Sequence, residues 1–224
     1  MNSSPKPKRI PVNTNLSYWH DDTYNGYPLM VDKGPFIREY LERLYFTLQY
    51  ALTDYARVFA FRFDLRVPSD NRLSADVMTN RVIRRFMASF DAKIKHERER
   101  ARSRNRSSHR TCVRYFWVRE VGDKGRPHYH CIVFLNKDAY RSLGSLKSDD
   151  MNMHERLKSA WASALKLKVA DMSGVVQIPK GTTFHLNRSN HLVDYEFMRR
   201  SSYLCKSATK RYGDGQHGCG GSRC

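Results

Sequence analysis

The chain has 224 residues, of which 40% are hydrophobic and 12% aromatic, so it is long and apolar enough for one large domain with a packed core. It carries 40 Lys and Arg residues against 22 Asp and Glu residues, and the formal net charge of +18 points to a polyanionic partner, most simply nucleic acid. A membrane partner is disfavoured, because no apolar stretch approaches the roughly 18 residues that a spanning helix needs.

The ends of the chain differ in composition from its middle. Residues 1–33 lack hydrophobic periodicity and a secretion signal, so they are expected to form an irregular N-terminal arm. Residues 34–212 are predicted to form one domain, and residues 213–224 a flexible Gly- and Cys-rich tail, although its His and Cys residues are also possible metal ligands. The five cysteines form no metal-like pairs in the body of the chain, which is typical of a reduced, cytoplasmic protein.

Hydrophobic periodicity predicts alternating helices and strands. Helices are expected at residues 36–55, 75–96, 151–168 and 192–210. Strands are expected at residues 58–67 and 174–178, with a hairpin at 113–135. This order favours an α+β fold in which helices pack on one face of an antiparallel sheet of about four to five strands.

The strand at 58–67 alternates between two kinds of side chain. One face carries phenylalanines and is expected to be buried, while Arg62, Asp64 and Arg66 lie on a polar face. Asp64 is either an ordinary solvated carboxylate or a supporting residue near an active site or bound DNA.

A strongly basic run follows the second predicted helix. Seven of the sixteen residues from Lys95 to Arg110 are Lys or Arg. This run is either a solvated helix end and loop or a phosphate-binding surface, and the high net charge favours the second. The candidate nucleic-acid-binding residues in the whole chain are Arg62, Arg66, Arg98, Arg100, Arg102, Arg104, Arg106 and Arg126.

The hairpin carries the candidate metal site. His128 and His130 are two apart at the start of an apolar run, so on a strand both point to one face. Gly122 to Gly125 is a turn, and a turn of three or five residues places Glu120 opposite His128. Two imidazoles and a carboxylate with one side open suit Mn²⁺ or Mg²⁺ catalysis better than a closed zinc site.

A candidate nucleophile lies near the C-terminus. Tyr203 and Lys206 are three apart and are expected to share a helix face. A nearby ammonium favours the phenolate form, which is the nucleophile, while a metal polarises the phosphate under attack. Each residue also has a structural interpretation, as a core tyrosine and a surface lysine.

Three segments resemble a known family. Gly125 to Tyr140, with its His-Tyr-His sequence, resembles the signature of the inovirus-type second-gene-product family, which are phage and prophage proteins related to rolling-circle replication initiators. The segments 58–66 and 202–206 look like the family's first strand motif and its tyrosine motif. The resemblance covers about residues 36–210 and extends to the wider group of HUH endonucleases, named for histidine–hydrophobic–histidine.

This resemblance implies a fold and an activity. It implies a central antiparallel, RRM-like sheet with flanking helices, and an enzyme that nicks one DNA strand at a replication origin through a 5′-phosphotyrosine and then rejoins strands. His128, His130 and Glu120 would hold the metal and Tyr203 would attack, with a host helicase as a partner. Tyr195 is eight residues from Tyr203, so a single nucleophile is expected. The alternative is a prophage regulator that binds nucleic acid on the same fold without catalysis.

Overall fold

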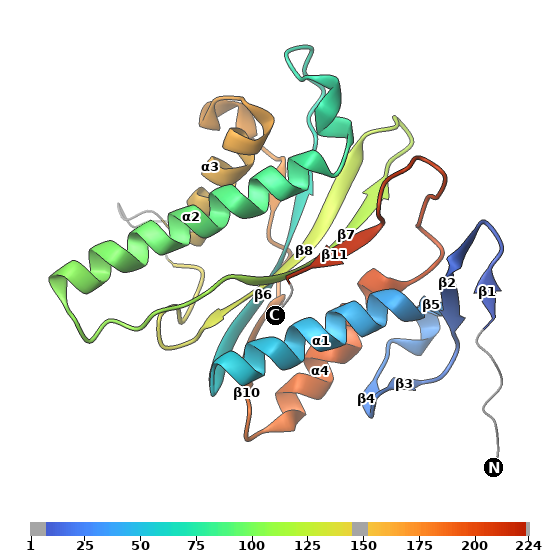
Figure 1. The fold of residues 1–224 in the computed structure, drawn as a ribbon, viewed down its shortest axis with the longest axis horizontal. Coiled ribbons are helices and arrows are strands. Elements are labelled where there is room, and N and C mark those ends of the chain that lie inside the picture. The colour runs from blue at the N-terminus through green and yellow to red at the C-terminus, as the bar shows by residue number, and fades with distance from the viewer. Residues whose placement is uncertain (1–7, 145–151, 223–224) are drawn as a thin grey trace.

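The computed structural model describes residues 8–144 and 152–222. Its centre is an antiparallel sheet with the strand order β10, β6, β8, β7, β11 (Figure 1). The bounds of these strands are Thr183–Asn187, Arg57–Arg66, Pro127–Asn136, Arg114–Val121 and Cys219–Gly221. A short strand, β9 (Val176–Gln177), also pairs with β6. The predicted α+β class with an antiparallel sheet is therefore confirmed.

Helices cover both faces of this sheet, whereas the sequence suggested one face. α2 (Arg81–Arg104) and α3 (Met153–Leu165) pack on the face that carries Phe59, Phe61 and Phe63. α1 (Arg38–Asp54) and α4 (His191–Ser202) pack on the opposite face, as Figure 1 shows. The second face is only partly polar: Val58 and Ala60 are fully buried under α1 and α4, and the polar residues on this face of β6 begin at Arg62. This change from apolar to polar side chains along one face positions the site described below.

Two helices differ from their predicted bounds by more than one turn. The helix expected at 75–96 is a 3₁₀ turn, Ala75–Met78, followed by α2, which continues through the basic run to Arg104. Met78 therefore lies outside the buried stripe of α2 and is exposed. The helix expected at 192–210 ends at Ser202 and is followed by a 3₁₀ turn, Tyr203–Cys205. The chain then becomes extended, because Lys206 forms a β-bridge with Phe36.

The N-terminal segment is more regular than the expected irregular arm. Within its described part, β1 (Arg9–Ile10) pairs with β2 (Asn13–Trp19), and β2 pairs with β5 (Phe36–Ile37) just before α1. A small hairpin joins β3 (Thr23–Tyr24) and β4 (Tyr27–Pro28), and a 3₁₀ turn spans Val31–Lys33. Apolar residues of these strands join the α1/α4 core, so burial rather than periodicity orders the segment.

The C-terminal segment, predicted to be a flexible tail, adds the edge strand β11 to the sheet. Cys219, Gly220 and Gly221 pair with Val118, Trp117 and Phe116 of β7. A Cβ on Gly220 would lie 2.5 Å from Cζ2 of Trp117, so only glycine fits here. The glycine content that suggested flexibility instead permits this close approach.

Substitution of Gly220 therefore tests the attachment of β11. We expect Gly220→Ala to lower the free energy of unfolding by about 1–3 kcal/mol, the usual effect of overpacking, and to speed hydrogen exchange at the amides of β7. Gly122→Ala is the control, since a Cβ there meets nothing nearer than 3.9 Å. Equal stability of the two variants would contradict the close packing of β11 on Trp117.

Four 3₁₀ turns occur in all within the described residues, the fourth being Val169–Met172 beside α3. None of the helices described here combines the length and apolarity that crossing a membrane requires.

Candidate metal centre

The hairpin of β7 and β8 has the predicted register. Glu120 is directly opposite His128, and the five residues 122–126 connect the strands. The loop is closed by the amide of Gly122, which donates to the carbonyl of Arg126 at 3.1 Å, and Gly125 takes a left-handed φ of +73°. The loop thus fixes the position of the carboxylate relative to the two histidines.

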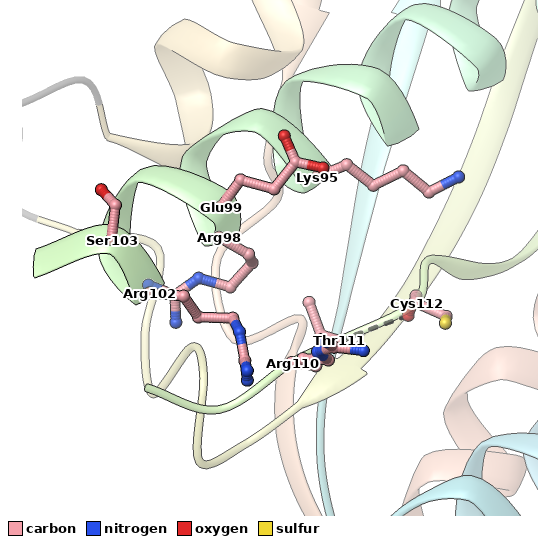
Figure 2. A pocket seen from close by; sticks show the side chains of 8 residues that line it. All are labelled: Lys95, Arg98, Glu99, Arg102, Ser103, Arg110, Thr111 and Cys112. Atoms are coloured by element: carbon pink, nitrogen blue, oxygen red, sulfur yellow. Dashed lines mark hydrogen bonds between the residues drawn. The ribbon is translucent and has the colours of Figure 1, made fainter. Parts of the chain in front are cut away.

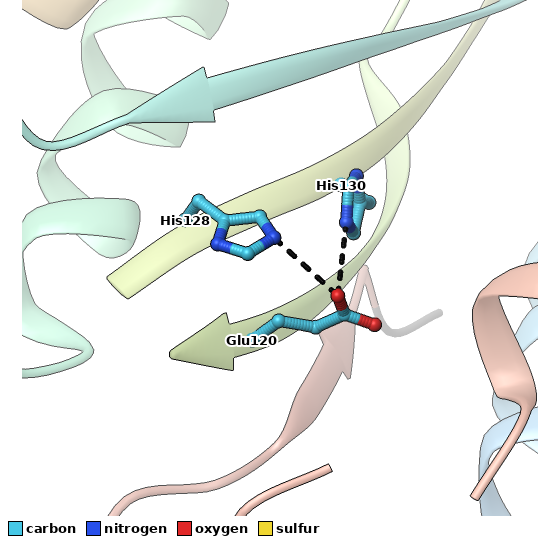
Figure 3. Close-up of side chains that lie close together, drawn as sticks. All are labelled: Glu120, His128 and His130. Atoms are coloured by element: carbon cyan, nitrogen blue, oxygen red, sulfur yellow. Dashed lines mark hydrogen bonds and ion pairs between the residues drawn. The ribbon is translucent and has the colours of Figure 1, made fainter. Parts of the chain in front are cut away.

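Glu120, His128 and His130 converge on one point (Figure 3). Each offers one ligand atom, and these atoms all lie within 4.8 Å of one another. Nε2 of His128 and Nε2 of His130 are each 3.4 Å from Oε2 of Glu120. All three side chains lie on the α1/α4 face, at the end of the sheet where the apolar cover stops. The arrangement offers two imidazole nitrogens and one carboxylate oxygen to a single cation.

A second row of polar residues from β6 fixes His130. Oδ1 of Asp64 accepts a 2.8 Å hydrogen bond from Nδ1 of His130, so Nε2 is directed toward Glu120. Arg62 contacts both carboxylate oxygens of Asp64, at 3.2 and 3.3 Å, and its Nη2 lies 3.2 Å from Nδ1 of His130. Of the two interpretations of Asp64 from sequence, the supporting position beside the site is the one observed.

Two residues that the sequence analysis missed hold Glu120. Nζ of Lys210 lies 2.5 Å from Oε1 of Glu120, and the Thr209 hydroxyl also donates to Oε1. The Lys210 side chain is only 1% exposed. Because Oε1 is occupied in this way, Oε2 is the oxygen left facing the histidines. No spacing or periodicity could have identified Lys210, which is 90 residues from Glu120 in a segment without a motif.

The electrostatics of the site reflect this crowding of opposite charges. Burial raises the pKa of Glu120, but the two histidines and Lys210 outweigh burial and hold that pKa far below its usual range. Burial lowers the pKa of His130, but hydrogen bonds to Asp64 and Glu120 reverse the effect and raise it. Burial also lowers the pKa of Lys210, which the Glu120 charge partly offsets. Glu120 is therefore a carboxylate throughout the physiological range.

Tyr203 approaches this site from the end of α4. It is half-buried at the start of the 3₁₀ turn, and the Arg62 guanidinium lies 6.0 Å from its ring centroid. Nζ of Lys206 lies 3.8 Å from the same centroid, over the ring face. The two residues are in contact but do not share an α-helix as expected. Arg62 is thus close both to the ring of Tyr203 and to Nδ1 of His130.

The candidate nucleic-acid-binding arginines form two separate groups. Arg66 and Arg126 line a pocket of about 400 Å³ that includes His128 and Lys124, and Arg62 lies beside His130. The arginines of α2 and the loop after it (Arg98, Arg100, Arg102, Arg104 and Arg106) are elsewhere, because α2 packs on the opposite face of the sheet. The structure therefore brings only Arg62, Arg66 and Arg126 together with the metal-ligand candidates.

Sequence comparisons place the chain among known proteins. The pattern of the YagK/YfjJ C-terminal domain family matches residues 19–222. The chain is 31% identical to YagK of Escherichia coli (strain K12) over 209 residues, which is 90% of this chain and 98% of YagK. It is 28% identical to YfjJ of the same organism over 200 residues, 85% of this chain and 96% of YfjJ. No solved structure matches. Because the family pattern covers nearly the whole sequence, the chain belongs to the YagK/YfjJ C-terminal domain family.

Proposed function

We propose that this protein is a metal-dependent DNA endonuclease and strand transferase of the HUH type, which initiates rolling-circle replication on single-stranded origin DNA. The observation that carries the proposal is the convergence of Glu120, His128 and His130 on one point, with Tyr203 approaching across Arg62. The shared neighbour Arg62 supports the pairing of this site with Tyr203, although 73 residues separate His130 from Tyr203 in sequence.

The ligand set fits Mn²⁺ or Mg²⁺. Among the described residues it contains two imidazoles, one carboxylate oxygen and no thiolate, and these three ligands leave open positions for a substrate oxygen and water. Asp64 orients one histidine from behind, as carboxylates commonly do at metal centres. A bound divalent cation would polarise a non-bridging oxygen of the scissile phosphate and offset its developing charge.

The proposed reaction is a transesterification carried by Tyr203. Its phenolic oxygen loses its proton to solvent, attacks the phosphorus and forms an O–P bond. The bond from phosphorus to the 3′ oxygen breaks, and this oxygen takes a proton from solvent to become a 3′-hydroxyl. The reverse reaction with a second 3′-hydroxyl joins strands. Nζ of Lys206 lies over the face of the Tyr203 ring, 3.8 Å from the ring centroid, so a positive charge stands beside the attacking residue. Arg62 is placed to contact a phosphate between the two sites.

The pocket beside His128 offers a path for the strand that flanks the nick. Arg66, Lys124 and Arg126 line it together with His128 itself. Three cations and one carboxylate, Asp123, line this cavity of about 400 Å³, and the net positive charge suits the phosphodiester backbone of single-stranded DNA, which is held largely by charge. A host helicase that unwinds the duplex is the expected partner, and the bacterial cytoplasm the expected location.

The test is capture of the covalent intermediate. The protein is incubated with Mn²⁺ and single-stranded oligonucleotides containing a randomised segment and a 3′ fluorophore, and is then denatured in SDS. We expect a labelled protein band with 3′-labelled but not 5′-labelled DNA, because a 5′-phosphotyrosine retains the 3′ fragment. The band should be lost in Tyr203→Phe by at least about 1,000-fold, since no other group replaces the nucleophile.

Tyr195→Phe is the matched control, because this half-exposed tyrosine of α4 packs against Tyr27 and should leave the adduct intact. An adduct that persists in Tyr203→Phe would exclude Tyr203 as the nucleophile. DNA binding by the native chain without any adduct would favour the alternative, a nucleic-acid-binding prophage regulator on the same fold.

A further inference from the structure

A second basic site lies at the C-terminal end of α2, far from the metal-ligand candidates. α2 packs on the face of the sheet opposite to Glu120, with Phe90 and Ile94 buried beneath it. Nη1 of Arg98 donates to the carbonyl of Ala139, just beyond the end of β8. His128 is at the other end of that ten-residue strand, and at about 3.3 Å per residue the two ends are roughly 30 Å apart.

This site is a pocket of about 590 Å³ (Figure 2). α2 provides one side of it, through residues spaced three and four apart on a single helix face: Lys95, Arg98, Glu99, Arg102 and Ser103. The extended segment that leads into β7 provides the other side, through Arg110, Thr111 and Cys112. Four cationic side chains therefore line one cavity together with a single carboxylate.

The cations of the pocket differ in how far they are already neutralised. Lys95 pairs with Asp91 at 2.7 Å, and Arg98 pairs with the neighbouring Glu97 at 3.1 Å. Arg102 donates to the carbonyl of Ser108, and neither it nor Arg110 has a carboxylate within ion-pair distance among the described residues. Two arginines thus face the cavity without an ion pair, against the single carboxylate of Glu99.

Arg98 adds a further donor to the pocket. Its Nε is buried and has no hydrogen-bond partner among the described residues, although its two other nitrogens are engaged. Buried donors without a partner are unusual in folded proteins, and this one belongs to a residue that lines the pocket.

We propose that this pocket binds the phosphodiester backbone of a DNA segment other than the one at the metal site. The inference rests on the proposed function only in naming DNA as the polyanion; the pocket itself requires neither metal nor Tyr203. The pocket and the metal site are on opposite faces of the sheet and roughly 30 Å apart, which is about one turn of a DNA duplex. DNA held in both sites must therefore bend around the sheet or be present as two segments. The pocket would hold DNA while the other site cleaves it.

The test uses two double variants of the full chain that remove the same charge. Arg102→Gln with Arg110→Gln empties the pocket of its unpaired cations. Arg81→Gln with Arg84→Gln is the matched control, since both are exposed residues in the first turn of α2, at the opposite end of the helix from the pocket. Binding of a 40-nucleotide single strand and of a 40-base-pair duplex is measured by fluorescence anisotropy over a series of salt concentrations.

We expect the pocket variant to weaken binding at least tenfold and the control less than threefold. The negative slope of log K against log salt concentration should become shallower if two phosphate contacts are lost, by about 1.8 for the duplex or about 1.4 for the single strand. The DNA form whose slope changes in this way is the form that the pocket holds. Equal weakening by the two variants would overturn the proposal in favour of diffuse attraction, as would no weakening by either.

The exposed Cys112 gives a second readout that needs no substitution. DNA in the pocket should slow its alkylation by N-ethylmaleimide at least fivefold, measured by mass spectrometry of the native chain, and unchanged alkylation at saturating DNA would count against the pocket. Failure of the pocket proposal and failure of the proposed nuclease function give different results in these experiments. Protection of Cys112 without any covalent adduct would support the pocket and refute the nuclease, and an adduct without protection would do the reverse.

Discussion

Replacement of His130 by alanine should abolish metal-dependent adduct formation and weaken Mn²⁺ binding by more than about 100-fold. The expectation follows from geometry, since Nε2 of His130 is directed at the shared ligand point by the hydrogen bond from Nδ1 to Asp64. Loss of a supporting partner at a metal centre typically costs 10–100-fold in affinity, and loss of the ligand itself should cost more. Isothermal titration with MnCl₂ measures the affinity, and the SDS assay measures the adduct.

Asp64→Asn should weaken Mn²⁺ binding less than His130→Ala does. It keeps the size of the side chain but removes the charge that accepts from His130, so we expect a loss of about 10–100-fold in Mn²⁺ affinity. His109→Ala is the control, because this exposed histidine is in the loop after α2 and should leave Mn²⁺ binding unchanged. Native Mn²⁺ affinity in His130→Ala would show that the three residues are not a metal site.

Lys210→Met should produce the largest change in stability. The ammonium is almost completely buried against Glu120, and removal of one partner from a buried ion pair usually costs 3–5 kcal/mol. Because two histidines also contact Glu120, we expect a loss of about 3 kcal/mol in the metal-free protein. At about 2–4 °C per kcal/mol, the Tm should fall by roughly 6–12 °C. Urea unfolding in EDTA measures the free energy.

Two comparisons isolate the charge effect. Lys158→Met breaks a more exposed pair with Glu155 and should cost less than about 1 kcal/mol. Combination of Lys210→Met with Glu120→Gln should recover part of the loss, since the unpaired carboxylate is then removed. If Lys210→Met were as stable as the native chain, the ion pair would have no role in fixing Glu120.

The parts of the fold that could be predicted from sequence are those whose signal is local. Phe59, Phe61 and Phe63 alternate, and α2 carries a buried stripe, so both elements are visible as periodicity. The register of Glu120 against His128 followed from the length of a short turn. Each of these features depends on residues within about 25 positions of one another.

The features that sequence reasoning missed depend on distant partners. β11 is Gly-rich because it packs against Trp117, and composition alone cannot distinguish this from flexibility. Lys210 is defined as a site residue only by its contact with Glu120 across the fold. α4 was expected to be longer because its polar C-terminal residues do not signal where Lys206 turns to pair with Phe36. Long-range pairing, not local preference, sets these positions.

The pairing of β11 with β7 also covers the strand edge that β7 would otherwise leave free. The amide of Arg119 donates to Gly218 and the amide of Ser222 donates to Tyr115, so hydrogen bonds along the outer side of β7 are occupied on either side of the three paired residues. A free strand edge is a template for another chain and a common origin of aggregation. The last described residues therefore cover the outer edge of β7, so the strand that carries Glu120 is closed to pairing with another chain.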